Sequence, residues 1–173
     1  MTKLPKIAIV ILNWNGQKLF SQFLPSVIEH SNAENIEIIV ADNGSTDQSI
    51  SFLNKNFPSI KVLDLKQNYG FAEGYNRALK QIQADYFVLL NSDVEVTEKW
   101  IEPCITQFEA DKKIAAVQPK ILSYSQRDSF EYAGAAGGFI DKFGYPFCRG
   151  RILNQLEKDK QQYNVSTQIF WAS

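Results

Sequence analysis

Two carboxylates follow directly after an apolar run near the middle of the chain. The run "YFVLL" (86–90) has the continuous apolar character of a buried parallel strand, and Asn91, Ser92, Asp93 and Glu95 lie just beyond it. Asp93 and Glu95 are two residues apart, so in an extended chain their side chains point the same way. Hard oxygen ligands of this kind suit Mg²⁺ or Mn²⁺. The alternative is a solvated turn before the next helix.

Three earlier apolar runs are each followed by a similar polar cluster: "NWNG" (13–16), "DNGSTD" (42–47) and "QNYG" (67–70). Asn, Asp, Gly and Ser are ordinary loop residues, so any single cluster is explained by turn chemistry. In a parallel sheet, however, all four clusters lie at one edge, where ligands bind. Four in succession therefore favour a shared binding site.

The first two clusters hold candidate ligand contacts. Asp42 is the first residue beyond its apolar run, too early to cap a helix and well placed to accept a hydrogen bond from a base or a ribose. Asp47 is better explained as a cap of the following helix. Asn13 and Asn15 flank Trp14, which is either a core residue or a lid over a planar ring.

Arg77 lies on the helix predicted after "QNYGF". Its guanidinium either points at a diphosphate or makes a surface ion pair, and the sequence leaves both open.

The periodicity of apolar residues places these clusters between alternating strands and helices. It predicts strands at 6–12, 36–41, 60–65 and 85–90, with helices at 17–31, 48–57 and 71–84. Strands alternating with helices of this length imply βαβ units and an α/β fold with a mostly parallel sheet flanked by helices.

The second half of the chain is less regular. We predict a helix at 97–111, with Thr97 as its N-cap and Pro103 as an irregularity. The remaining segments are predicted as an interrupted strand (114–122), a Gly-rich loop or short hairpin (132–151), a solvated or mobile segment (153–163) and a terminal strand (166–173).

Composition excludes several function classes. The formal net charge of −1 argues against a nucleic-acid binder. Cys104 and Cys148 form no spacing pattern and suit a reducing compartment. With His30 as the single histidine, neither a Ser-His-Asp triad nor a His-rich zinc site can form. No G-x-G-x-x-G follows the first strand, no P-loop motif is present, and no apolar run is long enough to span a membrane.

The motifs "VILNWNG", "ADNGSTDQS", "NYGFAEGYNRAL" and "YFVLLNSDVEV", in this order and spacing, resemble glycosyltransferase family 2. The later "AGAAGGFIDKFGYPFCRGR" and the terminal "FWAS" look like its bacterial rhamnosyltransferase-like branch. The resemblance implies a GT-A (Rossmann-like) fold, a nucleotide-diphosphate sugar donor and inversion at the anomeric centre. It also implies one GT-A domain over residues 1–173, with a nucleotide-binding half at 1–96 and a less regular acceptor-side portion at 97–173.

The resemblance also implies roles for the candidate residues. Asn91 and Asp93 match the metal-binding D-x-D position of the family, with Asp93 as a ligand of Mg²⁺ or Mn²⁺ and Glu95 as a second carboxylate. Because Asn91 replaces an aspartate, it adds no negative charge, and weaker metal affinity is expected. Nucleotide contacts are implied for Asn13, Trp14, Asn15, Asp42, Asn68, Arg77 and Asn91.

The family places its catalytic base in a carboxylate motif beyond a strand like "QIFWAS", so we expect the base to lie beyond Ser173 and residues 1–173 to form the donor-binding part. The expected partners are a UDP- or dTDP-sugar and a cell-surface glycan or lipid-linked acceptor. The expected location is cytoplasmic, with peripheral association at the inner face of the membrane as a further expectation. Two alternatives are a non-catalytic nucleotide-sugar-binding domain of this fold and, less favoured, a nucleotidyltransferase.

Overall fold

The computed structural model describes residues 4–131, 135–152, 155–164 and 167–169. The chain divides into two compact units, residues 1–98 and residues 99–173. Each unit has its own secondary structure.

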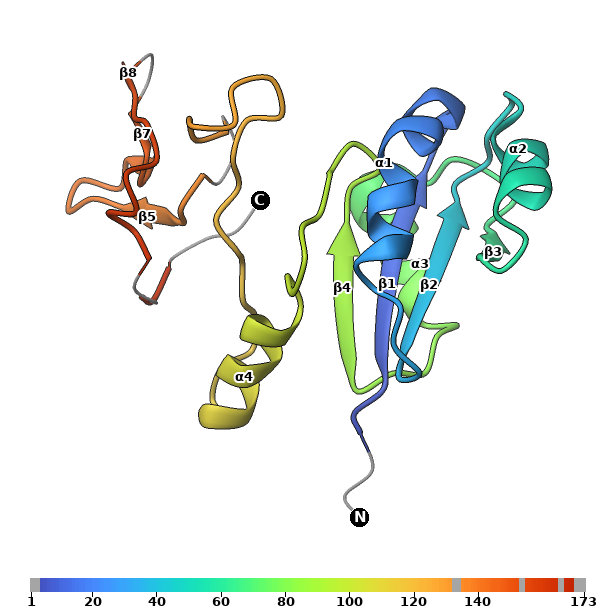
Figure 1. The fold of residues 1–173 in the computed structure, drawn as a ribbon, viewed down its shortest axis with the longest axis horizontal. Coiled ribbons are helices and arrows are strands. Elements are labelled where there is room, and N and C mark those ends of the chain that lie inside the picture. Colours follow the sequence, from blue (N-terminus) through green and yellow to red (C-terminus); the bar gives the residue numbers. More distant parts are fainter. Residues whose placement is uncertain (1–3, 132–134, 153–154, 165–166, 170–173) are drawn as a thin grey trace. The chain divides into compact units, whose positions relative to one another are not determined.

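The first unit is built on a four-stranded parallel sheet (Figure 1). Its strands lie in the order β3-β2-β1-β4, with bounds β1 Ile7–Asn13, β2 Ile36–Asp42, β3 Lys61–Asp64 and β4 Tyr86–Leu90. The strands end within two residues of the ends predicted from the sequence. The predicted α/β fold with a parallel sheet is therefore confirmed.

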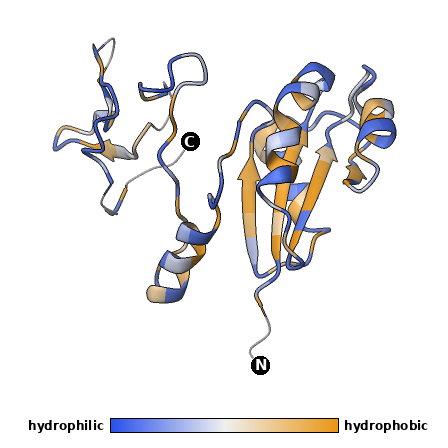
Figure 2. Ribbon diagram, viewed as in Figure 1, coloured by the Kyte–Doolittle hydropathy of each residue, from blue (hydrophilic) through white to orange (hydrophobic). Residues whose placement is uncertain are grey.

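Three helices connect these strands: α1 Gln17–Glu29, α2 Ser49–Asn56 and α3 Phe71–Leu79. In Figure 1, α1 lies over one face of the sheet and α3 lies behind it. Alternate residues of β1 point to opposite faces of the sheet. On one face, Ala8 and Val10 pack in a buried cluster with Tyr75 and Ala78 of α3. Figure 2 shows the strands as the most hydrophobic part of this unit, as expected of a parallel sheet covered on both faces.

The second unit contains helix α4 Glu102–Ala110 and a small antiparallel sheet in the order β5-β6-β7-β8. These strands are β5 Gly138–Ile140, β6 Pro146–Cys148, β7 Arg151–Ile152 and β8 Gln155–Leu156. The predicted hairpin within 132–151 is thus present as β5 and β6.

Two predictions for this unit are wrong in detail. The N-cap of α4 is Ile101 rather than Thr97, and Pro103 lies in the first turn, where its missing N–H removes no helical hydrogen bond. The predicted strand at 114–122 does not form. Within it, Leu122 makes a single isolated bridge to Phe130, and Pro119 has no N–H to donate to a ladder.

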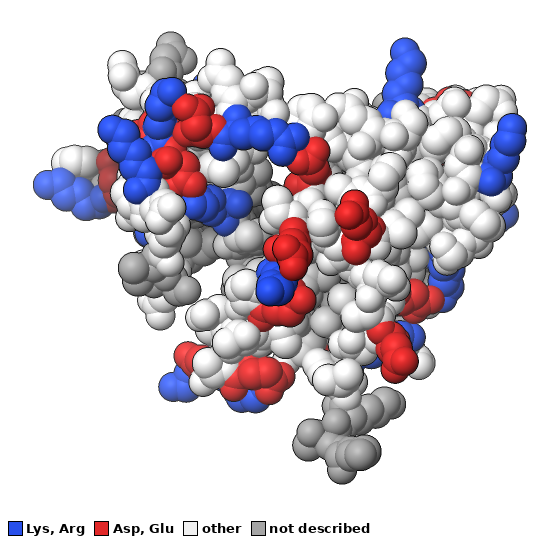
Figure 3. Space-filling view, viewed as in Figure 1, with Lys and Arg blue, Asp and Glu red and all other residues white. Residues whose placement is uncertain are grey.

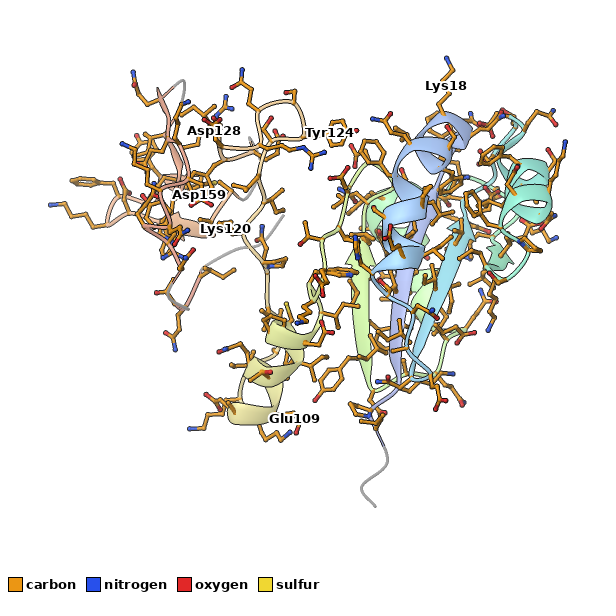
Figure 4. All side chains as sticks on the ribbon, viewed as in Figure 1. Lys18, Glu109, Lys120, Tyr124, Asp128 and Asp159 are labelled. Carbon is orange, nitrogen blue, oxygen red and sulfur yellow. The ribbon has the colours of Figure 1, made fainter. Side chains whose placement is uncertain are left out.

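The segment predicted to be solvated, 153–163, is tied to earlier residues where the structure describes it. Lys158 pairs with Asp128 (Nζ–Oδ2 2.6 Å) and Lys120 pairs with Asp159 (Nζ–Oδ2 2.5 Å). Lys120, Asp128 and Asp159 are labelled in Figure 4. Figure 3 shows positive and negative side chains interleaved on this unit. Most of the strand predicted at 166–173 lies outside the described residues. Over the described part of the chain, no helix is long and apolar enough to cross a membrane.

Candidate functional site

The carboxyl ends of neighbouring strands lie in line at one edge of the parallel sheet. The register pairs Asn13, the last residue of β1, with Asp42, the last residue of β2, and pairs Asp42 with Asp64 at the end of β3. This edge is where the polar clusters were predicted to meet, and it is the usual ligand-binding edge of an open parallel sheet.

Asn13 and Asp42 form a buried hydrogen-bonded pair at this edge. The Asn13 side-chain amide donates to Oδ1 of Asp42 (2.8 Å) and to Oγ of Ser45 (2.9 Å), and the Ser45 N–H donates to Oδ2 of Asp42 (3.0 Å). Asn13 and Asp42 are 0% and 1% exposed. Both oxygens of the Asp42 carboxylate therefore already accept hydrogen bonds from the protein, which meets the requirement of a buried polar group.

Gly16 brings the loop after β1 against the loop after β4. Its N–H donates to Oδ1 of Asn13 (3.1 Å). A Cβ at Gly16 would lie only 2.4 Å from that oxygen and 3.9 Å from Oγ of Ser92. Glycine is thus needed for the Asn13 side chain to keep its position, and the cluster containing Asp93 begins beside it.

Asn43 joins the loops after β2 and β3. Its side-chain amide donates to Oδ1 of Asn68 (3.2 Å) and to the Gly70 carbonyl (3.0 Å), and its Oδ1 accepts from the Tyr69 N–H (3.0 Å). Gly44 has φ +75°, and a Cβ there would lie 2.6 Å from the Gln67 backbone. The structure therefore brings the four clusters together pairwise along one edge.

Asn15 and Asp47 order the segment before α2. Asn15 has φ 56°, and its Oδ1 accepts from the N–H groups of Thr46 (2.7 Å) and Asp47 (3.2 Å). The Asp47 carboxylate accepts from the N–H groups of Ser49 (2.9 Å) and Gln17 (3.3 Å), which supports its predicted capping role although Gln48 is the formal N-cap. Partial burial by itself raises the pKa of Asp47, but the hydrogen bonds from Ser49 and Gln17 outweigh it and lower the pKa.

Trp14 and Arg77 each had two possible roles in the sequence, and the structure gives their surroundings. Trp14 is 60% exposed, so it is not a core residue. Arg77 donates from Nε to Glu73 (2.8 Å) in an i,i+4 pair, and its guanidinium carbon lies 3.9 Å from the centre of the Tyr69 ring. The surface ion pair is therefore present, and the guanidinium also lies over an aromatic ring.

Tyr75 was missed by the sequence analysis, although it lies within the quoted motif "NYGFAEGYNRAL". Its hydroxyl donates to the carbonyl of Leu90, the last residue of β4 (3.1 Å), and burial raises the pKa of the phenol. Asn43 and Ser45 were also passed over as ordinary turn residues of "DNGSTD". The sequence feature that could have identified Asn43 and Ser45 is their position just after β2, because residues that follow a parallel strand lie at the shared edge of the sheet.

The predicted metal ligand Asp93 is exposed, and among the described residues it has no hydrogen-bond or ion-pair partner. Its oxygens are hard donors free to bind a cation. No group of three or more His, Cys, Asp or Glu gathers anywhere in the described chain. This arrangement fits Mg²⁺ or Mn²⁺ held by one or two carboxylates, since such ions take their other ligands from substrate phosphates and water.

Comparison with known proteins gives a family match over nearly the whole chain: residues 8–171 match Glycosyl transferase family 2. A relative described as an uncharacterized glycosyltransferase of Haemophilus influenzae is 30% identical over 120 residues, which are 68% of this chain and 37% of the relative. The teichoic acid poly(glycerol phosphate) polymerase of Staphylococcus epidermidis is 28% identical over 95 residues, 53% of this chain and 13% of that protein. The chain thus spans well under half the length of these relatives.

Solved structures share the fold. The mannosyltransferase PcManGT of Pyrobaculum calidifontis, in complex with GDP-Man and Mn²⁺, matches with a TM-score of 0.57 and 19% identity, over 68% of this chain and 37% of that one. S. aureus TarS in complex with UDP matches with a TM-score of 0.53 and 23% identity, over 61% of this chain and 32% of that one. With an α/β sheet like theirs and a family match over residues 8–171, this chain belongs to glycosyltransferase family 2.

Proposed function

We propose that the carboxyl edge of the β3-β2-β1-β4 sheet binds the nucleotide-diphosphate sugar of an inverting glycosyl transfer. The donor is a UDP- or dTDP-sugar and the acceptor is a cell-surface glycan or a lipid-linked sugar, as in the rhamnosyltransferase-like branch that the later motifs resemble. In this proposal residues 1–96 are the nucleotide-binding half of one GT-A domain, which acts in the cytoplasm at the inner face of the membrane.

The observation that carries the proposal is the hydrogen-bond network of buried Asn13 and Asp42 with half-buried Ser45. Three polar side chains placed at a sheet edge are saturated by one another and by backbone groups, so the loops that carry exposed Trp14 and Asn15 are held rigid. A rigid edge with an exposed aromatic ring is suited to stacking on a base.

The proposed nucleotide contacts divide into two kinds. Asn13 and Asp42 position the loops, because their polar atoms already have protein partners. Trp14, Asn15, Asn68 and Asn91 are exposed and contact the nucleotide directly. Because Oδ1 of Asn15 and Oδ1 of Asn68 already accept hydrogen bonds from the protein, these two residues contact it through their side-chain NH₂ groups. Arg77 lies one helical turn beyond Glu73, and its remaining guanidinium N–H groups face the diphosphate.

Departure of the nucleoside diphosphate builds negative charge on its leaving oxygens. A divalent ion bound there, when present, stabilises this charge. Asp93 and Glu95 are the residues of this chain that we assign to hold it, with Asp93 as the main ligand because its carboxylate is exposed and has no partner among the described residues.

The test is calorimetric titration of UDP, dTDP and GDP into the chain, with and without Mn²⁺, repeated on Asp93→Asn. Asp64→Asn is the matched control, because Asp64 also ends a strand at this edge but pairs with Lys66. We expect UDP or dTDP binding that is tighter with Mn²⁺, and loss of this metal dependence in Asp93→Asn only. Absence of binding for all three nucleotides, or equal metal dependence in wild type and Asp93→Asn, contradicts the proposal.

A further inference from the structure

The hairpin formed by β5 and β6 presents a fully exposed aromatic tip. Every residue from 140 to 147 is exposed, and Phe143 and Tyr145 are 74% and 70% exposed. In Figure 1 this hairpin extends from the rest of its unit. Large aromatic side chains this exposed mark an interaction surface when they cluster.

Four backbone N–H groups at this tip are bonded within the turn, those of Asp141, Phe143, Gly144 and Tyr145. Oδ1 of Asp141 accepts from the N–H groups of Phe143 (2.8 Å) and Tyr145 (2.9 Å). The Gly144 N–H donates to the Asp141 carbonyl (3.1 Å), and the Asp141 N–H donates to the Tyr145 carbonyl (2.9 Å). N–H groups that are already bonded cost little free energy when they leave water, whereas unbonded N–H groups are costly in a lipid environment.

Apolar side chains continue along the small sheet behind the tip. The rings of Phe139 and Phe147, on paired positions of β5 and β6, stack with centroids 5.6 Å apart. Ile152 of β7 is 57% exposed. The aromatic tip is therefore supported by a rigid two-stranded stem rather than by a free loop.

The charge of this region is positive. Between residues 138 and 156 the sequence has three basic residues, Lys142, Arg149 and Arg151, against one acidic residue, Asp141. The Lys142 ammonium lies 4.9 Å from the centre of the Phe143 ring, so a cation and an aromatic ring share the tip. Arg149 donates twice to the Ala136 carbonyl (2.9 and 2.7 Å), which fixes the base of the hairpin.

We propose that the β5–β6 tip, centred on Phe143 and Tyr145, docks on the surface of an anionic lipid bilayer. The two rings enter the interfacial layer, as aromatic residues do at membrane surfaces, while Lys142 remains at the level of the anionic head groups. This surface belongs to residues 99–173, whereas the proposed donor site belongs to residues 1–96, and the proposal does not rest on nucleotide binding.

The test is co-sedimentation of the chain with phosphatidylcholine vesicles and with vesicles containing about one third phosphatidylglycerol, at low and high salt. We expect binding to the anionic vesicles that weakens with salt. In Phe143→Ser/Tyr145→Ser the affinity is expected to fall at least roughly tenfold, because two aromatic rings no longer leave water. The matched control Tyr124→Ser removes another exposed ring of the same unit and keeps the affinity.

A charge variant tests the second half of the proposal. Lys142→Gln is expected to weaken binding to anionic vesicles about fivefold, with no change for the control Lys113→Gln, another exposed lysine of this unit. Circular dichroism of each variant checks that the fold is kept. In Phe143→Trp, the added fluorescence is expected to shift to the blue and to be quenched by brominated lipid.

Three results would overturn the proposal: no vesicle binding by the wild-type chain, equal binding by Phe143→Ser/Tyr145→Ser, or an unshifted Phe143→Trp emission with vesicles present. Binding of a soluble polysaccharide that is lost in Phe143→Ser/Tyr145→Ser, without vesicle binding, would assign the tip to carbohydrate stacking instead. Nucleotide titration of the same variants separates this result from the proposed function, since donor binding is expected to be unchanged.

Discussion

The side-chain amide of Asn13 donates a 2.8 Å hydrogen bond to the Asp42 carboxylate, and both residues are excluded from solvent. The pair joins the last residues of two adjacent parallel strands, which the register places side by side. A polar pair buried at a strand end costs free energy unless every atom is bonded, and here Ser45 and Gly16 supply the remaining partners. The loops beyond β1 and β2 are thereby fixed to each other.

Removing either partner of this pair is expected to cost more than the hydrogen bond itself. In Asn13→Ala, Oδ1 of Asp42 loses its donor, and we expect the free energy of unfolding to fall by about 1–3 kcal/mol. Urea denaturation of Asn13→Ala, Asp42→Ala and the double variant measures the coupling, which is expected to be non-additive. Asn56→Ala, on the exposed side of α2, is the control. Strictly additive losses would mean that the pair acts as two independent groups.

Tyr75 is expected to act on the proposed metal-binding segment, residues 91–95, through the end of β4. Tyr75→Phe keeps the ring, including its edge contact with Phe71, but removes the hydroxyl that donates to the Leu90 carbonyl. We expect a loss of about 0.5–1.5 kcal/mol in unfolding free energy. We also expect weaker Mn²⁺-dependent nucleotide binding, because Leu90 directly precedes the segment that holds Asp93. Tyr145→Phe, which removes an exposed phenol elsewhere, should change neither measurement.

The sequence predicted the sheet well because its signals are local. Each apolar run of unit 1 is bounded by turn residues, and β1 and β2 match their predicted starts and ends within one residue. The shared edge then follows from strand direction alone, so the meeting of the four clusters could be predicted without coordinates. After residue 98 the apolar runs are no longer cleanly bounded by turn residues, and the strand predicted at 114–122 was wrong. That run contains Pro119, which cannot donate to a ladder, and it pairs only at Leu122.

The sequence could not say which polar residues of a cluster face inward. Asp42 was expected to meet a base or a ribose. Its bond from the Ser45 N–H is local, but its burial and its bond from Asn13 depend on a contact between loops 29 residues apart in the sequence. Trp14 was ambiguous for the same reason, since a loop residue becomes core or surface only once its neighbours are placed. Local pattern gives the position of a side chain along an element but not the partner that saturates it.

The ionisation of Asp47 is expected to give a small, acid-dependent part of stability. The hydrogen bonds that lower its pKa favour the charged carboxylate in the folded chain, so this stabilisation is fully present above the ordinary value of 3.8 and is lost as pH falls through the lower folded pKa. Because Asp47 is exposed, the contribution is expected to stay below about 1 kcal/mol. Urea denaturation of wild type and Asp47→Asn from pH 7 to pH 2.5 checks this: their difference in unfolding free energy should shrink below pH 4. A constant difference would contradict it.

Asn91→Asp is expected to strengthen metal binding, because it restores the first carboxylate of the family's D-x-D pattern. Asn91 is exposed and lies two residues before Asp93, with a turn at Ser92 and Asp93. A second carboxylate about 4 Å from a divalent ion at the surface contributes on the order of 1–2 kcal/mol, or roughly tenfold in affinity. Mn²⁺ titration followed by electron paramagnetic resonance, with and without UDP, measures this gain directly.

Two comparisons make the Asn91 result specific. In the absence of nucleotide, Asn91→Ala should bind Mn²⁺ about as well as the wild type, because the Asn91 amide adds no charge. The double variant Asn91→Asp/Asp93→Asn again has a single carboxylate at these two positions, so it should lose the gain in Mn²⁺ affinity. The gain should also fall as salt rises, since an exposed carboxylate attracts the ion through solvent. If Asn91→Asp leaves Mn²⁺ affinity unchanged, the two side chains do not share a ligand, and the metal assignment then rests on Asp93 and Glu95 alone.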